Sequence, residues 1–253
     1  MATGPNVVLT EYKYSLQGGG YGLPDDPDSI GARFVKTLDK LNHINPSFSN
    51  WLLTDRVTLK QVKLADVRGR IGVLVEKNAR SDGFERPDPS EGFFMRAANA
   101  SVAGPGGASF LVVTEPRDKA HMFEMQFGWD QQGVDASLIT YPLFKATLLS
   151  ILADWPSAWA MATGFKSKLR HVPDGPAIRV ETESFHRLTW LAYLPEERTA
   201  DLDLPAGLIT ERTPDGGLLM IVDRARPESS NVAQMQRADR LTEIMTKRWQ
   251  PHR

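Results

Sequence analysis

The chain has 253 residues, with 30 basic and 31 acidic side chains and a formal net charge of -1. This balance argues against a protein that binds nucleic acid through a large basic surface. Hydrophobic residues make up 41% of the sequence and charged residues 24%, which are globular proportions. The absence of cysteine excludes disulfides, cysteine nucleophiles and cysteine-ligated metal centres.

The first residues lack the basic and apolar regions of a secretory signal. The longest uncharged stretch, residues 97–114, is interrupted by glycine and proline and is too broken to cross a membrane. We therefore expect a cytoplasmic protein that does not enter membranes.

The opening residues, 7–14, are rich in β-branched and aromatic side chains and predict a strand, which the glycines of 18–22 are expected to end. Asp26 and Pro27 predict the start of an amphipathic helix that ends before Pro46. Apolar residues at helical spacing predict a second, continuous helix over 64–78.

Three strands are predicted next, over 92–98, 109–114 and 122–128, and their short connections make neighbours antiparallel. Thr140 is expected to cap a third helix that ends at Trp155-Pro156. Further strands are predicted over 158–163, 188–194, 207–210 and 217–223, the last two as a hairpin, and a terminal helix begins near Val232.

This order lacks the regular strand and helix alternation of a doubly wound fold. It predicts an α+β class with a mostly antiparallel sheet flanked by about four helices. We interpret residues 1–253 as one α+β domain, which two closely packed sheet-plus-helix halves would also satisfy.

Catalytic and metal-binding patterns are weak throughout. The glycines of 18–22 lack the lysine and serine or threonine of a phosphate-binding loop. No two of the five histidines have the spacing that places metal ligands on one helical face. Asp174, Glu181 and Glu183 approach the pattern of a metal-dependent nuclease, but Glu183 occupies the position where such a motif has lysine. We therefore expect neither an enzyme, nor a metal, nor a cofactor.

Tryptophans 155, 159 and 190 stand in apolar contexts and are interpreted as core residues, each needing one acceptor for its N–H. An exposed tryptophan would instead be an interface anchor.

Several short segments together resemble the bacterial immunity protein family numbered 52, whose members accompany the toxins of polymorphic and type VI secretion systems. The resemblance extends over most of the chain. It is carried by Tyr12-Lys13-Tyr14, by 44–48 with Trp51, by 78–82 with 91–93, by 155–159 and by 190–194.

This resemblance implies a cytoplasmic inhibitor that binds a cognate secreted toxin, commonly a nuclease of restriction-endonuclease fold. It implies no catalytic residues and leaves the oligomeric state open. A cytoplasmic enzyme with an unrecognised active site and an adaptor of a secretion system remain alternatives.

Two acidic segments are candidates for the toxin-binding surface, because a nuclease presents a basic groove to phosphates. The first contains Asp25 and Asp28 beside the expected cap Asp26. The second is bounded by prolines and contains Glu196, Glu197, Asp201 and Asp203. Solvated acidic loops without a partner are the alternative.

Overall fold

The computed structural model describes residues 8–22, 26–80, 88–99, 107–115, 120–127, 135–170, 178–181, 188–228 and 231–248. Its strands are β1 (Val8–Tyr21), β2 (Leu52–Asp55), β3 (Lys60–Lys63), β4 (Phe93–Ala98), β5 (Ala108–Glu115), β6 (Ala120–Phe127), β7 (Trp159–Arg170), β8 (Ile178–Glu181), β9 (Leu188–Leu194), β10 (Ile209–Arg212) and β11 (Leu218–Ile221). The α-helices are α1 (Pro27–Ile44), α2 (Leu64–Val67), α3 (Ile71–Lys77), α4 (Tyr141–Asp154) and α5 (Val232–Arg248). Short 3₁₀ turns are η1 (Arg68–Arg70), η2 (Pro89–Glu91), η3 (Ala136–Leu138) and η4 (Glu196–Arg198).

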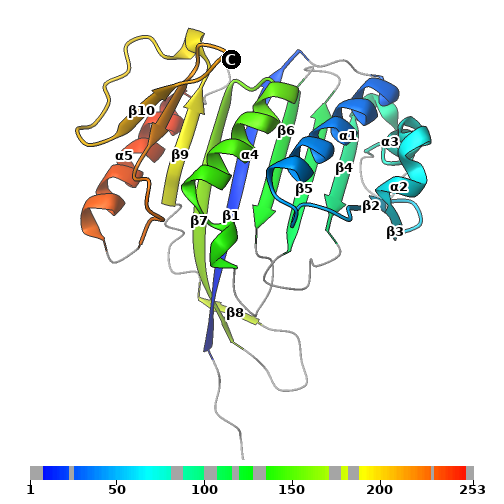
Figure 1. Cartoon of the computed structure of the whole chain (residues 1–253), viewed down its shortest axis with the longest axis horizontal. Helices are drawn as coiled ribbons and strands as arrows, with labels where there is room; N and C mark the ends of the chain where they lie inside the picture. The colour runs from blue at the N-terminus through cyan, green and yellow to red at the C-terminus, as the bar shows by residue number, and fades with distance from the viewer. Residues whose placement is uncertain are drawn as a thin grey trace, which may run out of the picture.

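One eleven-stranded sheet runs through the molecule (Figure 1). The strand order is β10-β11-β9-β7-β1-β6-β5-β4-β2-β3, with β8 paired to β7, and every pairing is antiparallel. The predicted α+β class with a mostly antiparallel sheet is confirmed. Strand β1 lies near the middle, so the two parts of the chain that follow it extend the sheet in opposite directions.

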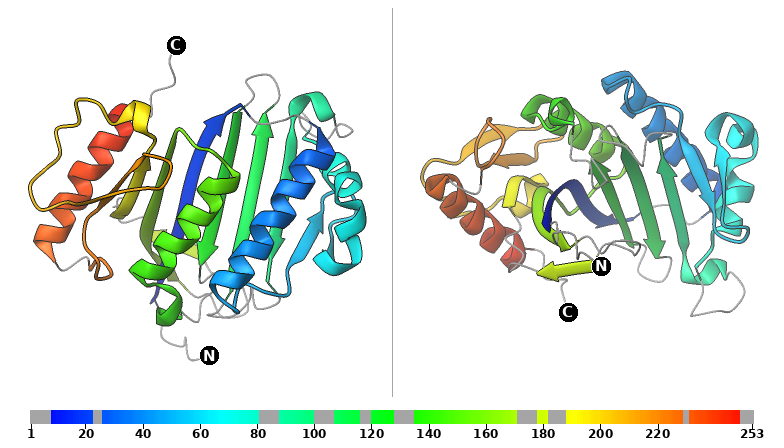
Figure 2. Two further views of the ribbon diagram at one scale, coloured as in Figure 1. Left: turned by 45° about the horizontal axis from the view of Figure 1, so that its top comes forward. Right: turned by 90° about the horizontal axis from the view of Figure 1, so that it is seen from below.

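Helices cover the two faces of the sheet unequally (Figure 2). Helices α1 and α4 lie on one face, where Phe34 stacks on Phe110 at 5.3 Å between ring centroids and Phe144 on Phe127 at 4.5 Å. Helix α5 lies on the other face and packs a second apolar cluster, including Leu241, against β9 and β11. The main core is therefore the layer between the sheet and α1 and α4.

The glycine-rich segment does not end the first strand, so that prediction is wrong. Strand β1 continues to Tyr21, because its glycines allow close approach where a side chain would collide. A Cβ on Gly18 would lie 2.5 Å from the Phe123 ring, and one on Gly20 would lie 2.4 Å from the Pro156 carbonyl oxygen. The glycines here serve packing within a strand.

The helix that begins at Pro27 is confirmed, and Asp26 caps it by accepting a 2.8 Å hydrogen bond from the Ser29 N–H. Hydrogen bonds from the Ser29 hydroxyl and from its N–H lower the pKa of the Asp26 carboxyl. The helix expected over 64–78 is not continuous, which corrects the prediction. Arg70, with φ −138° and ψ 33°, leaves the helical region after Gly69, and α3 starts afresh. Helix α2 ends at Val67, and the 3₁₀ turn that separates it from α3 contains Gly69, a poor helix former.

The strands predicted over 92–98, 109–114 and 122–128 correspond to β4, β5 and β6, and 188–194 is β9. The hairpin of β10 and β11 and the terminal helix α5 also occur as predicted. Thr140 occupies the N-cap position of α4 but makes no side-chain capping hydrogen bond there. The sequence interpretation missed β2, β3 and β8, and it placed the end of β7 seven residues too early.

Candidate functional site

Asp28, from the first acidic segment, lies exposed in the first turn of α1. Its carboxylate touches the start of α3, since a Cβ on Gly72 would lie 1.7 Å from Asp28 Oδ1. Asp25, its predicted companion, lies outside the described residues. Asp28 therefore adjoins the α1–α3 contact, well away from the second acidic segment beyond β9 (Figure 1).

The second acidic segment forms η4 and the turn that follows it. Glu196, Glu197, Asp201 and Asp203 are all exposed, as a binding surface requires. Arg248, at the end of α5, fixes this segment: its guanidinium donates to the carbonyls of residues 200 and 201, and its own carbonyl accepts a 2.9 Å bond from Arg198.

Basic side chains also border this acidic segment. Arg240, Lys247 and Arg248 of α5 line a hollow of about 240 Å³ together with Asp201 and Asp203. The four predicted acidic residues therefore lie together, but Asp201 and Asp203 face a surface of mixed charge. Glu196 lies against the turn between β10 and β11, since a Cβ on Gly216 would lie 2.7 Å from Glu196 Oε2.

The described residues contain no group of three or more histidines and carboxylates placed to hold a metal ion. Among them His43 is exposed on α1 and His121 is buried. The other three histidines, 171, 186 and 252, and the carboxylates of Asp174 and Glu183 lie outside the described residues. Within the described part of the chain no helix is long and apolar enough to cross a membrane.

The most buried carboxylate, Asp154, has a structural role. It lies at the end of α4 and is 2% exposed. Lys40 and Lys36 approach its Oδ1 at 2.7 and 3.0 Å, and Thr37 contacts its Oδ2 at 3.2 Å. This network joins α1 to α4 and commits the Asp154 carboxylate to packing.

A second polar cluster is equally committed to packing. Glu211 of β10 accepts hydrogen bonds from Lys145 and Tyr141 of α4, and Lys145 holds the pKa of the Glu211 carboxyl below its usual value. Burial, with help from Glu211, raises the pKa of the Tyr141 phenol to about 12. The cluster ties α4 to the edge of the sheet.

A different surface distinguishes this molecule: the sheet face opposite α1 and α4, over β7, β1, β6, β5 and β4. Alternation along each strand directs Phe110, Phe123 and their same-face neighbours into the core, so the residues between them point to this other side. Helix α5 packs over β9, β11 and the margin of β7, and no other described helix covers the remainder (Figure 2). We call this surface the open face.

Strand register arranges the open face in rows that cross the strands. One row is almost wholly apolar and consists of Trp159, Gly19, Met122, Val113 and Phe94. We call it the apolar row. Five strands about 4.8 Å apart make it about 19 Å long. Met122 is 57% exposed, an unusual condition for a methionine in mid-sheet.

More polar rows lie on both sides of the apolar row. On the side toward the end of β1 lie Tyr21, Ala120 and Glu115. On the other side lie Met161, Gln17, Glu124, Leu111 and Arg96. In the row beyond them, Thr163, Ser15, Ser109 and Ala98 are buried, so the exposed part of the open face ends there. The Gln17 amide donates to Glu124 at 3.2 Å, and Arg56 lies over the Phe94 ring at 5.1 Å. The apolar row therefore has a polar rim.

The apolar row of the open face has the composition of an interface core. The three exposed rows contain three charged side chains, Glu115, Glu124 and Arg96, and neither lysine nor aspartate. Tyrosine, tryptophan, phenylalanine and methionine are enriched at interface cores, whereas lysine, aspartate and glutamate are depleted, so the two glutamates belong to the polar rim. A solvated antiparallel face normally has a more polar composition.

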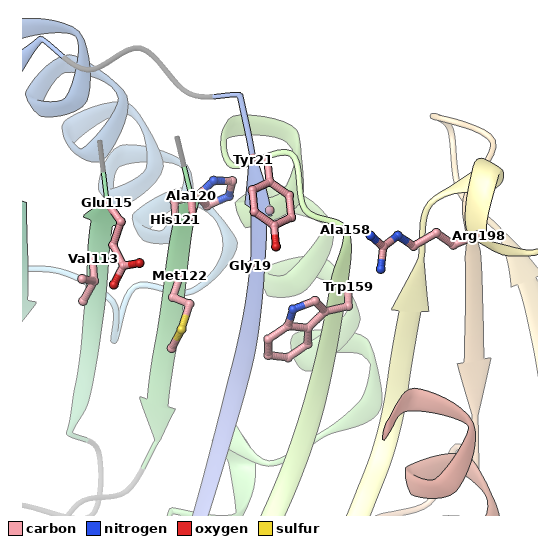
Figure 3. Close-up of a pocket in the computed structure, with 11 residues that line it drawn as sticks. Gly19, Tyr21, Val113, Glu115, Ala120, His121, Met122, Ala158, Trp159 and Arg198 are labelled. Atoms are coloured by element: carbon pink, nitrogen blue, oxygen red, sulfur yellow. The ribbon is translucent and has the colours of Figure 1, made fainter. Parts of the chain in front are cut away.

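A depression in the apolar row lies at Gly19 (Figure 3). Its volume is about 190 Å³. Trp159 and Met122 flank it, Tyr21 and Val113 contribute further apolar walls, and Glu115 and Arg198 stand at its border. Arg198 reaches it from η4, so the depression adjoins the predicted acidic residues Glu196 and Glu197.

Sequence reasoning missed the open face, although it interpreted the tryptophans partly correctly. Trp155 and Trp190 are 0% and 1% exposed, and their N–H groups bond Thr37 and the Asp223 carbonyl, which confirms them as core residues. Trp159 is different: it points to the open face and is only half-buried at the margin of the α5 cluster. The signal that could have placed Trp159 on the open face was the alternation of side chains along β7, since Trp159 and Ala160 face opposite sides of the sheet.

No known family model matches the sequence, and no curated protein matches it either. The expected membership of immunity protein family 52 is therefore not supported. The structure is similar to that of the Pseudomonas aeruginosa T6SS protein PA0821, with a TM-score of 0.52 and 11% sequence identity. The similarity covers 94% of this chain and 73% of that one. At this identity the likeness shows a shared fold and nothing further.

Proposed function

We propose that this chain is a cytoplasmic immunity protein that binds and neutralises a cognate secreted toxin, a nuclease effector of a type VI secretion system. The observation that carries the proposal is the open face, a sheet surface whose apolar row has the composition of an interface core. The proposal requires a stable protein complex and no chemistry on the part of this chain.

The exposed rows of the open face can form the central part of a protein interface. Three same-face positions along a strand, about 6.7 Å apart, span about 13 Å, and the five strands span about 19 Å. The resulting area of about 250 Å² is about a third of what each partner contributes to an interface of standard size, about 800 Å². The neighbouring η4 segment supplies further contact surface beside it.

Charge supports a basic partner. Glu124 and Glu115 lie on the open face, the latter paired with Arg80, and the exposed Glu196 and Glu197 precede Arg198, which borders the depression. A nuclease has to present cationic groups to the phosphates of its substrate. Carboxylates placed at the border of an interface speed the encounter with such a surface.

The fold likeness to a protein of a type VI secretion system is a further argument for this setting. In this proposal the chain acts in the cell that makes the toxin and protects that cell and its kin. Protection demands a very small free fraction of toxin, so we expect a Kd of about 1 nM or tighter, equivalent to about 12 kcal/mol.

The test uses the product of an adjacent toxin gene. The full chain and this product are expressed together, growth is measured, and the purified complex is assayed by calorimetry and for residual nuclease activity. Rescue with a stoichiometric complex is the expected result. Turnover of a substrate by this chain alone would favour the enzyme alternative, and altered toxin export without protection would favour an adaptor.

A further inference from the structure

The apolar row is interrupted where β1 crosses it, because Gly19 has no side chain. A Cβ at Gly19 would lie 2.9 Å from the backbone oxygen of His121 and 3.3 Å from Met122 Cγ. Close approach of the strands therefore excludes any larger residue. The consequence on the open face is a gap between Trp159 and Met122, which forms the floor of the depression (Figure 3).

The size of the depression matches one side chain. Its volume is about 190 Å³. An engineered apolar cavity of about 150 Å³ in another protein holds a benzene molecule. A phenylalanine, leucine or methionine side chain entering from outside would therefore fill most of the space.

The charged groups at the border already have partners, which disfavours an ion as occupant. Arg198 donates to the Arg248 carbonyl at 2.9 Å, and Arg80 lies 2.8 Å from the Glu115 carboxylate. The remaining lining includes His121, which is buried, and the aromatic and aliphatic groups of Tyr21, Met122 and Trp159. An apolar group gains from burial against such walls without breaking an ion pair.

The depression also continues a cluster that is already packed. Trp159 and Met161 lie against the apolar cluster beneath α5. A side chain placed at Gly19 would contact Trp159 on one side and Met122 on the other. It would thereby extend the packed layer beneath α5 along the apolar row.

We infer that the depression at Gly19 receives one large apolar side chain projecting from the toxin, and that this side chain anchors the complex. The inference rests on the proposed function and specifies its contact. Anchors of this kind, in a pocket near the centre of an interface, carry a large share of the binding free energy. The rim residues would then exclude water around the anchor.

The experiment fills the depression from a neighbouring position. Ala120 lines it and is partly exposed, so a larger residue there would occupy the space without entering the core. We expect Ala120→Ser to bind the purified toxin within about threefold of wild type. Ala120→Leu should bind less tightly, and Ala120→Trp at least about 30-fold less tightly, the loss that marks a hot-spot contact. The change should lie mainly in the dissociation rate.

The matched control is Val73→Trp. Val73 is 51% exposed on α3, which packs against α1 and away from the open face. The Val73→Trp variant adds a tryptophan to the surface, as Ala120→Trp does, but away from the open face. We expect its affinity for the toxin and its melting temperature to stay at the wild-type values. Met122→Glu supplies a second test, which remains valid if Ala120→Trp fails to fold. This substitution places a charge at the wall of the depression. We expect it also to weaken binding at least about 30-fold.

The outcomes separate the two proposals. Failure of the wild-type chain to bind the toxin overturns the proposed function. Binding by the wild type, with Ala120→Trp and Met122→Glu both folded and both within threefold of it, overturns the anchor while leaving the immunity function in place.

Discussion

Protonation of His121 should destabilise the fold as the pH falls. The ring is 2% exposed on β6, lies 5.9 Å from Trp155 between centroids, and has no hydrogen-bond partner for either nitrogen among the described residues. Burial, reinforced by the nearby Arg33 guanidinium, lowers the pKa of His121 from 6.5 to about 4. The folded state therefore holds this side chain neutral.

The direction of the change in the free energy of unfolding follows from how tightly the folded and unfolded chains bind a proton at His121. Between pH 6.5 and pH 4 the unfolded chain binds a proton at this position more tightly than the folded chain, so the free energy of unfolding falls with pH in that window. At 1.36 kcal/mol for each unit of difference between the two pKa values, the loss is about 2 kcal/mol from pH 7 to pH 5 and about 3 kcal/mol by pH 4. Above about pH 7 His121 is neutral in both states, and this loss of stability is absent.

Urea unfolding of wild type and His121→Leu at pH 7, 6 and 5 measures this contribution. Carboxyls whose pKa is lowered by native contacts, such as Asp39 beside Arg68, also destabilise the fold in acid, but they are present in both proteins and cancel. We expect His121→Leu to lose about 2 kcal/mol less than wild type between pH 7 and pH 5. Parallel curves for His121→Leu and wild type would refute the reasoning.

Three further predictions concern packing and charge. Trp155→Ala should lower the free energy of unfolding by about 3 to 5 kcal/mol, because it empties a fully buried site and removes the 2.9 Å bond to Thr37; chemical denaturation measures it. Gly18→Ala should cost about 1 to 3 kcal/mol through collision with Phe123, whereas Gly69→Ala, with open space around its Cβ, should not destabilise the protein. Reversing the charge at Glu196, Glu197 and Asp203, with Asp201→Asn to suit its φ of 56°, should slow toxin association mainly at low salt and leave the melting temperature unchanged. An association rate equal to wild type at every salt concentration would exclude this segment from the encounter.

Most of the fold was predictable because its signals are local. Alternation in β4, β5 and β6 and the cap at Asp26 depend on neighbouring residues only, and both were interpreted correctly. The errors arose where a distant residue decides the conformation. The glycines of β1 favour a turn in isolation, and only the Phe123 ring and the Pro156 carbonyl explain why a strand needs them.

The candidate site was much less predictable than the fold. The sequence identified the exposed acidic segment around Glu196 from composition. It could not identify the open face, because that surface exists only once five strands lie in register and the helices have taken their faces. Trp159 shows the difficulty: its apolar neighbours Ala158 and Ala160 favour the core interpretation, and only the orientation of β7 places it on the uncovered side.

The acidic segment and the depression adjoin each other through Arg198, and together they suggest a division of labour in binding. Exposed carboxylates act over about 8 to 10 Å at ordinary salt, so they govern how fast a basic partner arrives. A side chain buried at Gly19 acts only on contact, so it governs how long the partner stays. The charge-reversed variant should therefore change the association rate and its salt dependence, and Ala120→Trp the dissociation rate, with nearly additive effects on affinity because the altered side chains do not share a contact. Strong coupling between them would mean that η4 moves when the toxin docks, and that Arg198, held by Arg248 in the free protein, exchanges that partner for one on the toxin.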